Sequence, residues 1–143
     1  MDTNFETPTP QLRVVIADDD PLVREIVATV IRAERSLTLV GESEDTASAV
    51  EAVLEHSPDV AVLDWVMPGG GGAMAAARIV RERPDTAIVA LTGEESEEAR
   101  LEMMRGGARG FLLKGSPPAQ LIETIHAVAR LQGDPVWNAH GQD

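Results

Sequence analysis

Short apolar segments alternate with longer segments of helical periodicity along most of this 143-residue chain. Apolar runs rich in β-branched residues predict strands, and apolar residues that recur every three or four positions predict helices with one buried face. The predicted strands are residues 12–17, 37–40, 60–64, 86–91 and 110–113, and the predicted helices are residues 21–33, 47–57, 73–83, 94–105 and 118–131. Because right-handed crossovers place helices on both faces of a parallel sheet, this alternation predicts a doubly wound α/β fold.

The length of the chain suits a single domain with one buried core. Residues 1–11 are polar and rich in Pro and Thr, so we expect a disordered N-terminal tail there. Residues 12–131 are expected to form the folded domain, and residues 132–143 a C-terminal tail or the start of a linker.

Composition excludes several classes of function. The chain has 12 basic and 24 acidic residues and a formal net charge of -12, which opposes binding to phosphate backbones, so we expect no direct contact with nucleic acid. It has no Cys, which excludes disulfides and thiolate chemistry. No apolar run approaches the length needed to span a membrane, and we expect a cytoplasmic protein without membrane contacts.

Polar residues follow or end four of the five predicted strands. Asp18 and Asp19 follow the first strand, Asp64 ends the third, Thr92 follows the fourth and Lys114 follows the fifth. In the flavodoxin-like strand order 2-1-3-4-5, these strand ends meet in one crevice. Three carboxylates repel one another there unless a cation joins them, and oxygen ligands suit Mg²⁺. With a Lys and a hydroxyl beside them for phosphoryl oxygens, the sequence predicts phosphorylation of Asp64.

The motifs at these strand ends are similar to those of one known family. They are Asp18-Asp19 after an apolar strand, residues 63–69 (LDWVMPG), residues 90–93 (ALTG) and residues 107–114 (GARGFLLK). Together they resemble the receiver domain of bacterial two-component response regulators over about residues 12–131. The stretches 20–22 (DPL) and 110–114 (GFLLK) resemble the subgroup whose receivers carry LuxR-type helix-turn-helix output domains.

The resemblance implies a set of roles at the predicted crevice. Asp64 resembles the phosphoacceptor, which takes its phosphoryl group from a sensor histidine kinase. Asp19 resembles the direct Mg²⁺ ligand, Asp18 a ligand that acts largely through water, and the backbone carbonyl of Val66 a further ligand. Such a domain is not an enzyme in the ordinary sense, because it catalyses only its own phosphorylation and dephosphorylation.

The resemblance also implies a switch. Thr92 resembles the hydroxyl that moves toward the phosphoryl oxygens, Lys114 the cation that pairs with them, and Phe111 the aromatic residue that reports the movement. The segments that follow Thr92 and Lys114, residues 94–105 and 118–131, form the face on which we expect regulated contacts, including a phosphorylation-dependent homodimer.

Two departures from the family leave alternatives open. Four consecutive glycines, residues 69–72, stand where many relatives have Asp-Gly at the last two positions, and we expect an unusually mobile loop there. Residues 134–143 resemble no output domain, so the chain is either a stand-alone receiver that acts through protein contacts or one piece of a transcription regulator.

Two other classes of protein compete with the switch. A phosphatase with an Asp nucleophile uses a second Asp two residues later as its proton donor, and Val66 occupies that position. A nucleotide- or flavin-binding module needs a phosphate-binding loop, and the glycine run lacks the Lys-Ser/Thr ending of such a loop.

Overall fold

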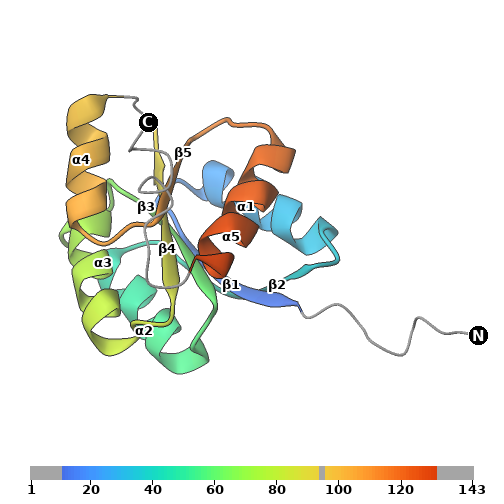
Figure 1. Ribbon diagram of the computed structural model, residues 1–143, viewed down its shortest axis with the longest axis horizontal. Helices are drawn as coiled ribbons and strands as arrows, with labels where there is room; N and C mark the ends of the chain where they lie inside the picture. Colours follow the sequence, from blue (N-terminus) through green and yellow to red (C-terminus); the bar gives the residue numbers. More distant parts are fainter. Residues whose placement is uncertain (1–10, 94–95, 132–143) are drawn as a thin grey trace, which may run out of the picture.

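The computed structural model describes residues 11–93 and 96–131. Within them, five parallel strands form one sheet in the order β2-β1-β3-β4-β5 (Figure 1). The strands are β1 (Leu12–Ala17), β2 (Leu37–Ser43), β3 (Val60–Asp64), β4 (Ala87–Thr92) and β5 (Gly110–Leu113). The helices are α1 (Pro21–Ala33), α2 (Thr46–His56), α3 (Gly71–Glu82), α4 (Glu97–Arg105) and α5 (Pro118–Arg130). The predicted flavodoxin-like fold is therefore confirmed.

Helices cover both faces of the sheet and divide the core into two layers. On one face, α1 and α5 pack against the strands (Figure 1). Their Ile31 and Ile125 side chains are fully buried. On the other face, α2, α3 and α4 supply Val53, Ile79 and Met103 to a second buried cluster. Every residue of β3 and β4 is buried, because these two strands are covered on both faces.

Helix α1 begins where the acidic run predicts it. The Asp20 side chain accepts hydrogen bonds from the backbone N–H groups of Leu22 (2.9 Å) and Val23 (3.4 Å), which caps the helix, and Pro21 occupies its first turn. The helix buries Val27, Ala28 and Ile31. Two of its predicted apolar positions instead face solvent, since Leu22 is 67% and Ile26 is 55% exposed.

Helix α3 differs from the prediction in its first residue and in its buried face. It begins at Gly71, two residues before the predicted start, and it buries Gly72, Ala75, Ala76 and Ile79. The apolar positions predicted for this helix, Met74, Ala77 and Val80, are exposed. Small residues allow a close approach here: a Cβ atom at Gly72 would lie only 2.6 Å from the carbonyl oxygen of Asp64. Contact with the end of β3, rather than side-chain size, therefore selects the buried face.

The glycine run leads directly into α3. Gly69, Gly70 and Gly71 have φ values of 95°, 120° and 79°, a region of backbone conformation that favours glycine. The Thr46 N–H donates to the Pro68 carbonyl (3.0 Å), and the Thr46 hydroxyl donates to the Gly71 carbonyl (3.1 Å). Helix α2 thus holds both ends of the turn.

Strand β2 is three residues longer than predicted and contains a bulge. Leu39 pairs with Val14 and Gly41 pairs with Val15, so Val40 is an extra residue on β2. Leu39 packs toward the α1 side of the sheet, whereas Val40 packs toward the α2 side. The bulge changes the alternation of side chains along the rest of the strand.

The remaining boundaries differ little from the prediction. Strand β4 includes Thr92, and α4 begins after a Ser96 cap whose hydroxyl accepts from the Ala99 N–H (3.0 Å). The predicted start of this helix at residues 94–95, and the predicted tails at residues 1–10 and 132–143, lie outside the described residues. Within residues 11–93 and 96–131, no helix is both long and apolar enough to cross a bilayer.

Candidate functional site

The carboxyl ends of β1 and β3 bring three acidic side chains together. Asp64 is the last residue of β3, and Asp18 and Asp19 directly follow β1, which pairs with β3 through Ala17 and Leu63. One carboxylate oxygen from each of the three Asp residues lies within 4.8 Å of the others. Asp18 and Asp64 are each only 2% exposed, whereas Asp19 is exposed. The predicted crevice therefore exists, with one acidic side chain at its solvent edge.

Lys114 links the two buried carboxylates. Its Nζ lies 3.2 Å from Oδ2 of Asp18 and 3.2 Å from Oδ2 of Asp64. The Lys114 backbone N–H donates to the Thr92 carbonyl (2.7 Å), which fixes the backbone from which the Lys114 side chain extends. Burial lowers the pKa of Lys114, but its hydrogen bond to Asp18 and the charges of Asp64 and Asp18 outweigh this effect and raise the pKa. The ammonium group is therefore charged at neutral pH.

The Asp64 carboxyl group has a pKa raised to about 6. Burial is the largest cause, and the negative charge of Asp18 adds to it. The Val66 N–H, which donates to Oδ1 of Asp64 (3.2 Å), and the Lys114 ammonium both oppose the rise. Excess negative charge therefore persists in the pocket despite Lys114.

The donor set fits a divalent cation. Among the described residues, Oδ2 of Asp18 and Oδ2 of Asp64 are buried and accept no hydrogen bond, although Lys114 lies at ion-pair distance from both. Buried carboxylate oxygens without donors are costly unless a cation compensates them. Oxygen ligands close together, with an exposed carboxylate at the edge, suit Mg²⁺, which retains several waters when bound.

The three consecutive Asp residues have different surroundings. Oδ1 of Asp18 accepts a hydrogen bond from the Asp20 N–H (2.8 Å), which tightens the turn after β1. Asp20 caps α1 as described above, and it is not part of the acidic cluster. Turn formation and helix capping thus account for Asp18 and Asp20 in part, and only Asp19 has no such structural explanation.

The other predicted site residues surround this pocket. Thr92 is 6% exposed at the end of β4, next to Leu91, which pairs with Asp64. Phe111 is half-buried on β5. Val66 is 77% exposed, two residues beyond Asp64. All predicted site residues except Phe111 therefore lie at or next to the carboxyl edge, and their functional roles remain predictions.

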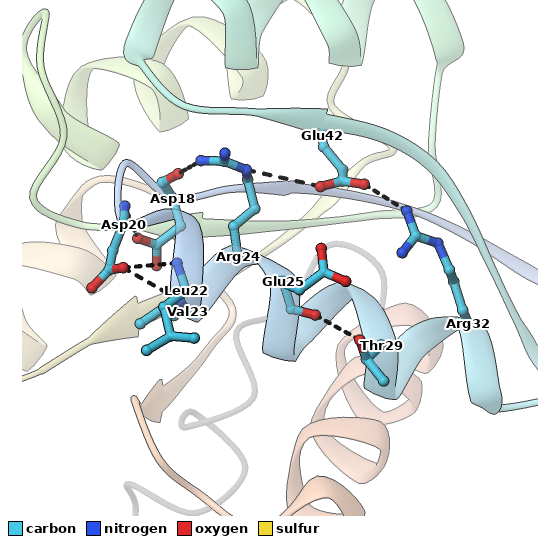
Figure 2. A network of polar contacts seen from close by, with 9 residues as sticks. All are labelled: Asp18, Asp20, Leu22, Val23, Arg24, Glu25, Thr29, Arg32 and Glu42. Atoms are coloured by element: carbon cyan, nitrogen blue, oxygen red, sulfur yellow. Dashed lines mark hydrogen bonds and ion pairs between the residues drawn. The ribbon is translucent and has the colours of Figure 1, made fainter.

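Two arginines near the site were not predicted from the sequence. The guanidinium of Arg100, on α4, lies 5.0 Å from the centre of the Phe111 ring. Arg24, on α1, donates through Nη1 to the Asp18 carbonyl oxygen (2.6 Å; Figure 2). The sequence held one weak indication for Arg24. A positive charge near a helix N-terminus is unfavourable because of the helix dipole, so an Arg at this position suggests a specific contact.

An apolar groove between α1 and α5 begins beside the acidic pocket. Lys114 and Gly115 line it at the pocket end, and Ile26 and Val30 line it along α1. Its wall is almost entirely apolar, and the exposed side chain of Leu22 lies on the same helix.

Comparisons with known proteins agree with this geometry. A family model described as "Response regulator receiver domain" matches residues 14–126. YxjL, an uncharacterized transcriptional regulatory protein of Bacillus subtilis, is 42% identical over 120 residues, which cover 84% of this chain and 55% of YxjL. The oxygen regulatory protein NreC of Staphylococcus carnosus is 36% identical over 120 residues, with 83% of this chain and 55% of NreC covered.

Solved structures of response regulators have the same fold as this chain. The signal receiver domain of NarL from Mycobacterium tuberculosis superposes with a TM-score of 0.81 at 35% identity and covers 85% of this chain and 98% of that domain. A LuxR-family response regulator from Aurantimonas has a TM-score of 0.80 at 26% identity, with 92% and 99% of the two chains covered. The chain spans about half the length of the curated relatives that it matches.

Proposed function

This chain belongs to the response regulator receiver domain family, and from that membership we propose that it is a Mg²⁺-dependent phosphoacceptor switch. A sensor histidine kinase donates the phosphoryl group and Asp64 accepts it. The observation that carries the proposal is the Asp64 carboxylate, which is buried at the end of β3 beside Lys114 and two further acidic side chains. Among the described residues, no hydrogen bond reaches its Oδ2 atom or that of Asp18.

Each site residue has a separate role in the phosphoryl transfer. An oxygen of Asp64 attacks phosphorus, an O–P bond forms, and the N–P bond to the kinase histidine breaks. Asp64 must be ionised to attack, which its pKa of about 6 allows at neutral pH. The Lys114 ammonium, already 3.2 Å from Asp64, neutralises charge on the transferred oxygens. Asp19, Asp64, the Val66 carbonyl and, through water, Asp18 would hold Mg²⁺, which supplies further charge neutralisation.

In this proposal, phosphorylation changes the conformation of the surface formed by α4, β5 and α5, which we call the α4–β5–α5 face. Thr92 lies at the end of β4, and its hydroxyl moves toward the phosphoryl oxygens in this proposal. Phe111 then changes its rotamer, which alters its contact with Arg100 on α4. This face is the proposed site of a phosphorylation-dependent homodimer.

Similarity to longer transcriptional regulators, of which the matched residues cover 55%, supports a role in transcription. We propose that the switch works in the cytoplasm and controls transcription through an output domain outside this chain, and that this chain itself does not contact nucleic acid. The alternative is a stand-alone receiver that acts through protein contacts. An Asp-nucleophile phosphatase is disfavoured, because Val66 cannot serve as the proton donor.

Acetyl phosphate, a small phosphoryl donor, tests the proposal. With Mg²⁺, we expect intact-mass spectrometry to show one added phosphoryl group per chain, and peptide mapping to place it on Asp64. Excess EDTA and the Asp64→Asn variant should each abolish the modification. Sustained hydrolysis of p-nitrophenyl phosphate without a stable adduct would instead identify the phosphatase.

A further inference from the structure

The backbone of Asp18 is held by neighbouring elements at both its N–H and its carbonyl group. The Asp18 N–H donates to the Ser43 carbonyl at the end of β2 (3.0 Å). The Asp18 carbonyl oxygen accepts from Nη1 of Arg24, one turn into α1 (2.6 Å; Figure 2). This second contact is short and involves a charged donor, which makes it stronger than a neutral hydrogen bond.

Holding this carbonyl also orients Asp19. A peptide group is planar, so the position of the Asp18 oxygen fixes the plane that contains the N and Cα atoms of Asp19. Asp19 is exposed, and packing therefore contributes little to its position. Its carboxylate must nevertheless stay within ligand distance of the other two Asp side chains if all three are to serve one cation.

The Arg24 side chain is itself fixed by a carboxylate on β2. Its Nε lies 3.8 Å from Oε1 of Glu42, while Oε2 of Glu42 accepts from Nη2 of Arg32 (2.7 Å; Figure 2). The Arg24 side chain is 21% exposed and that of Arg32 is 54% exposed. Arg24 and Arg32, both on α1, therefore share Glu42 of β2 as a partner, but only Arg24 reaches the turn that carries Asp19.

We infer that Arg24 is a positioning residue for the metal pocket: through the Asp18 carbonyl it holds Asp19 in place as a ligand. The inference rests on the proposed function, since it concerns Mg²⁺ binding at that site. The inferred effect of Arg24 on Mg²⁺ affinity is opposite in sign to the effect of its charge alone. A positive charge beside an acidic pocket repels Mg²⁺, so loss of charge alone would tighten binding. Loss of positioning would weaken it, by about tenfold if Arg24 resembles other groups that orient metal ligands.

Mg²⁺ titration of two matched variants distinguishes these effects. We expect Arg24→Met to raise the Mg²⁺ dissociation constant about tenfold in calorimetry. Arg32→Met, which removes the same charge and a contact with the same partner, Glu42, should change the dissociation constant by less than about twofold. Urea unfolding in EDTA should show similar stability for the two variants, which separates positioning from a general loss of structure. Arg24→Lys, which keeps the charge, replaces Arg24→Met if that variant does not fold, and it should also weaken binding.

Each result has a defined meaning. Unchanged or tighter Mg²⁺ binding by Arg24→Met, or by Arg24→Lys in its place, would overturn the inference and leave the proposed function intact. An equal loss of affinity in Arg32→Met would also overturn it, because the shared ion-pair network would then be responsible. Absence of Mg²⁺ binding by the wild-type protein would overturn the proposed function and, with it, this inference.

Discussion

Burial of the Asp64 carboxylate makes stability depend on pH in a defined direction. Its pKa is about 6 in the folded protein and 3.8 in an ordinary environment. Between these values the folded state binds a proton that the unfolded state has released, so the free energy of unfolding falls as pH rises through this window. The difference amounts to about 3 kcal/mol once Asp64 is fully ionised without a metal.

Asp64→Asn should therefore be more stable than the wild type in EDTA at about pH 8, because it removes the buried charge. The two proteins should converge near pH 4, where Asp64 is neutral. Urea unfolding at both pH values measures the difference. Mg²⁺ should stabilise the wild type and not the variant. A wild type that is the more stable protein at about pH 8 in EDTA would contradict the prediction.

We expect the side chain at position 66 to control how long the phosphoryl group persists on Asp64. Its side chain is 77% exposed two residues after Asp64, and it cannot form a hydrogen bond to the water that hydrolyses the aspartyl phosphate. Val66→Asn supplies such a group, and we expect it to shorten the lifetime about tenfold, equivalent to roughly 1.4 kcal/mol of barrier. Phosphate release from acetyl-phosphate-loaded protein measures this. Equal rates would show that position 66 does not orient water.

Residues at strand ends were the most predictable part of the site. Asp18, Asp64 and Lys114 were identified because strand boundaries are visible in the sequence and the strand order of the fold brings those ends together. Arg24 and Arg100 were not, because each reaches its partner through a long, flexible side chain whose direction no local pattern encodes.

At the scale of elements, α4 is the helix least held by the core. Only Met103 of α4 is fully buried, which agrees with the weak apolar pattern of its sequence. A helix with few buried apolar contacts belongs to the part of a fold that rearranges most easily. Its contact with β5 includes Arg100 and the Phe111 ring, so a change at Phe111 reaches it directly.

Beryllofluoride, which mimics a phosphoryl group, should therefore change hydrogen exchange in α4 and α5 more than in α2. Helix α2 packs at the other edge of the sheet and serves as the internal control (Figure 1). Sedimentation of the same samples tests the proposed homodimer, which should raise the sedimentation coefficient. If neither exchange nor self-association responds, α4 and α5 do not form the regulated face.

The elements differ in how far the sequence determined them. Helix α1 could be predicted to its ends, because Asp20 and Pro21 fix its start and its apolar residues recur regularly. For α3 the buried face was wrong. Its apolar residues are mostly alanines, and the requirement for Gly72 against the Asp64 carbonyl depends on tertiary contact.

At the scale of the whole molecule, the α1–α5 groove lies where a kinase would approach Asp64. Transfer between proteins requires the kinase to cover the carboxyl edge, and exposed apolar side chains beside a site mark surfaces that bind partners. Ile26 is 55% exposed in this groove, whose other end reaches Lys114. We therefore expect the kinase to contact α1 there.

Ile26→Glu should slow phosphotransfer from the cognate kinase at least about tenfold, because the new carboxylate must be desolvated in the complex. Phosphorylation by acetyl phosphate needs no such contact and should be unchanged. Met74→Glu is the matched control, since Met74 is 54% exposed on α3 at the opposite face of the sheet. Equal kinase rates for both variants would exclude the groove as the docking surface.

The extra residue in β2 has a consequence for comparing this chain with its relatives. The bulge keeps Glu42 on the α1 side of the sheet, because Glu42 pairs with Ile16, which packs on that side. A regular strand that retained Val40 would instead turn Glu42 toward α2, away from the arginines of α1. When relatives are aligned, an acidic residue at position 42 is therefore also equivalent in a chain that lacks both the bulge and the residue at position 40. Deletion of Val40 should thus resemble the loss of an apolar side chain more than the loss of Glu42.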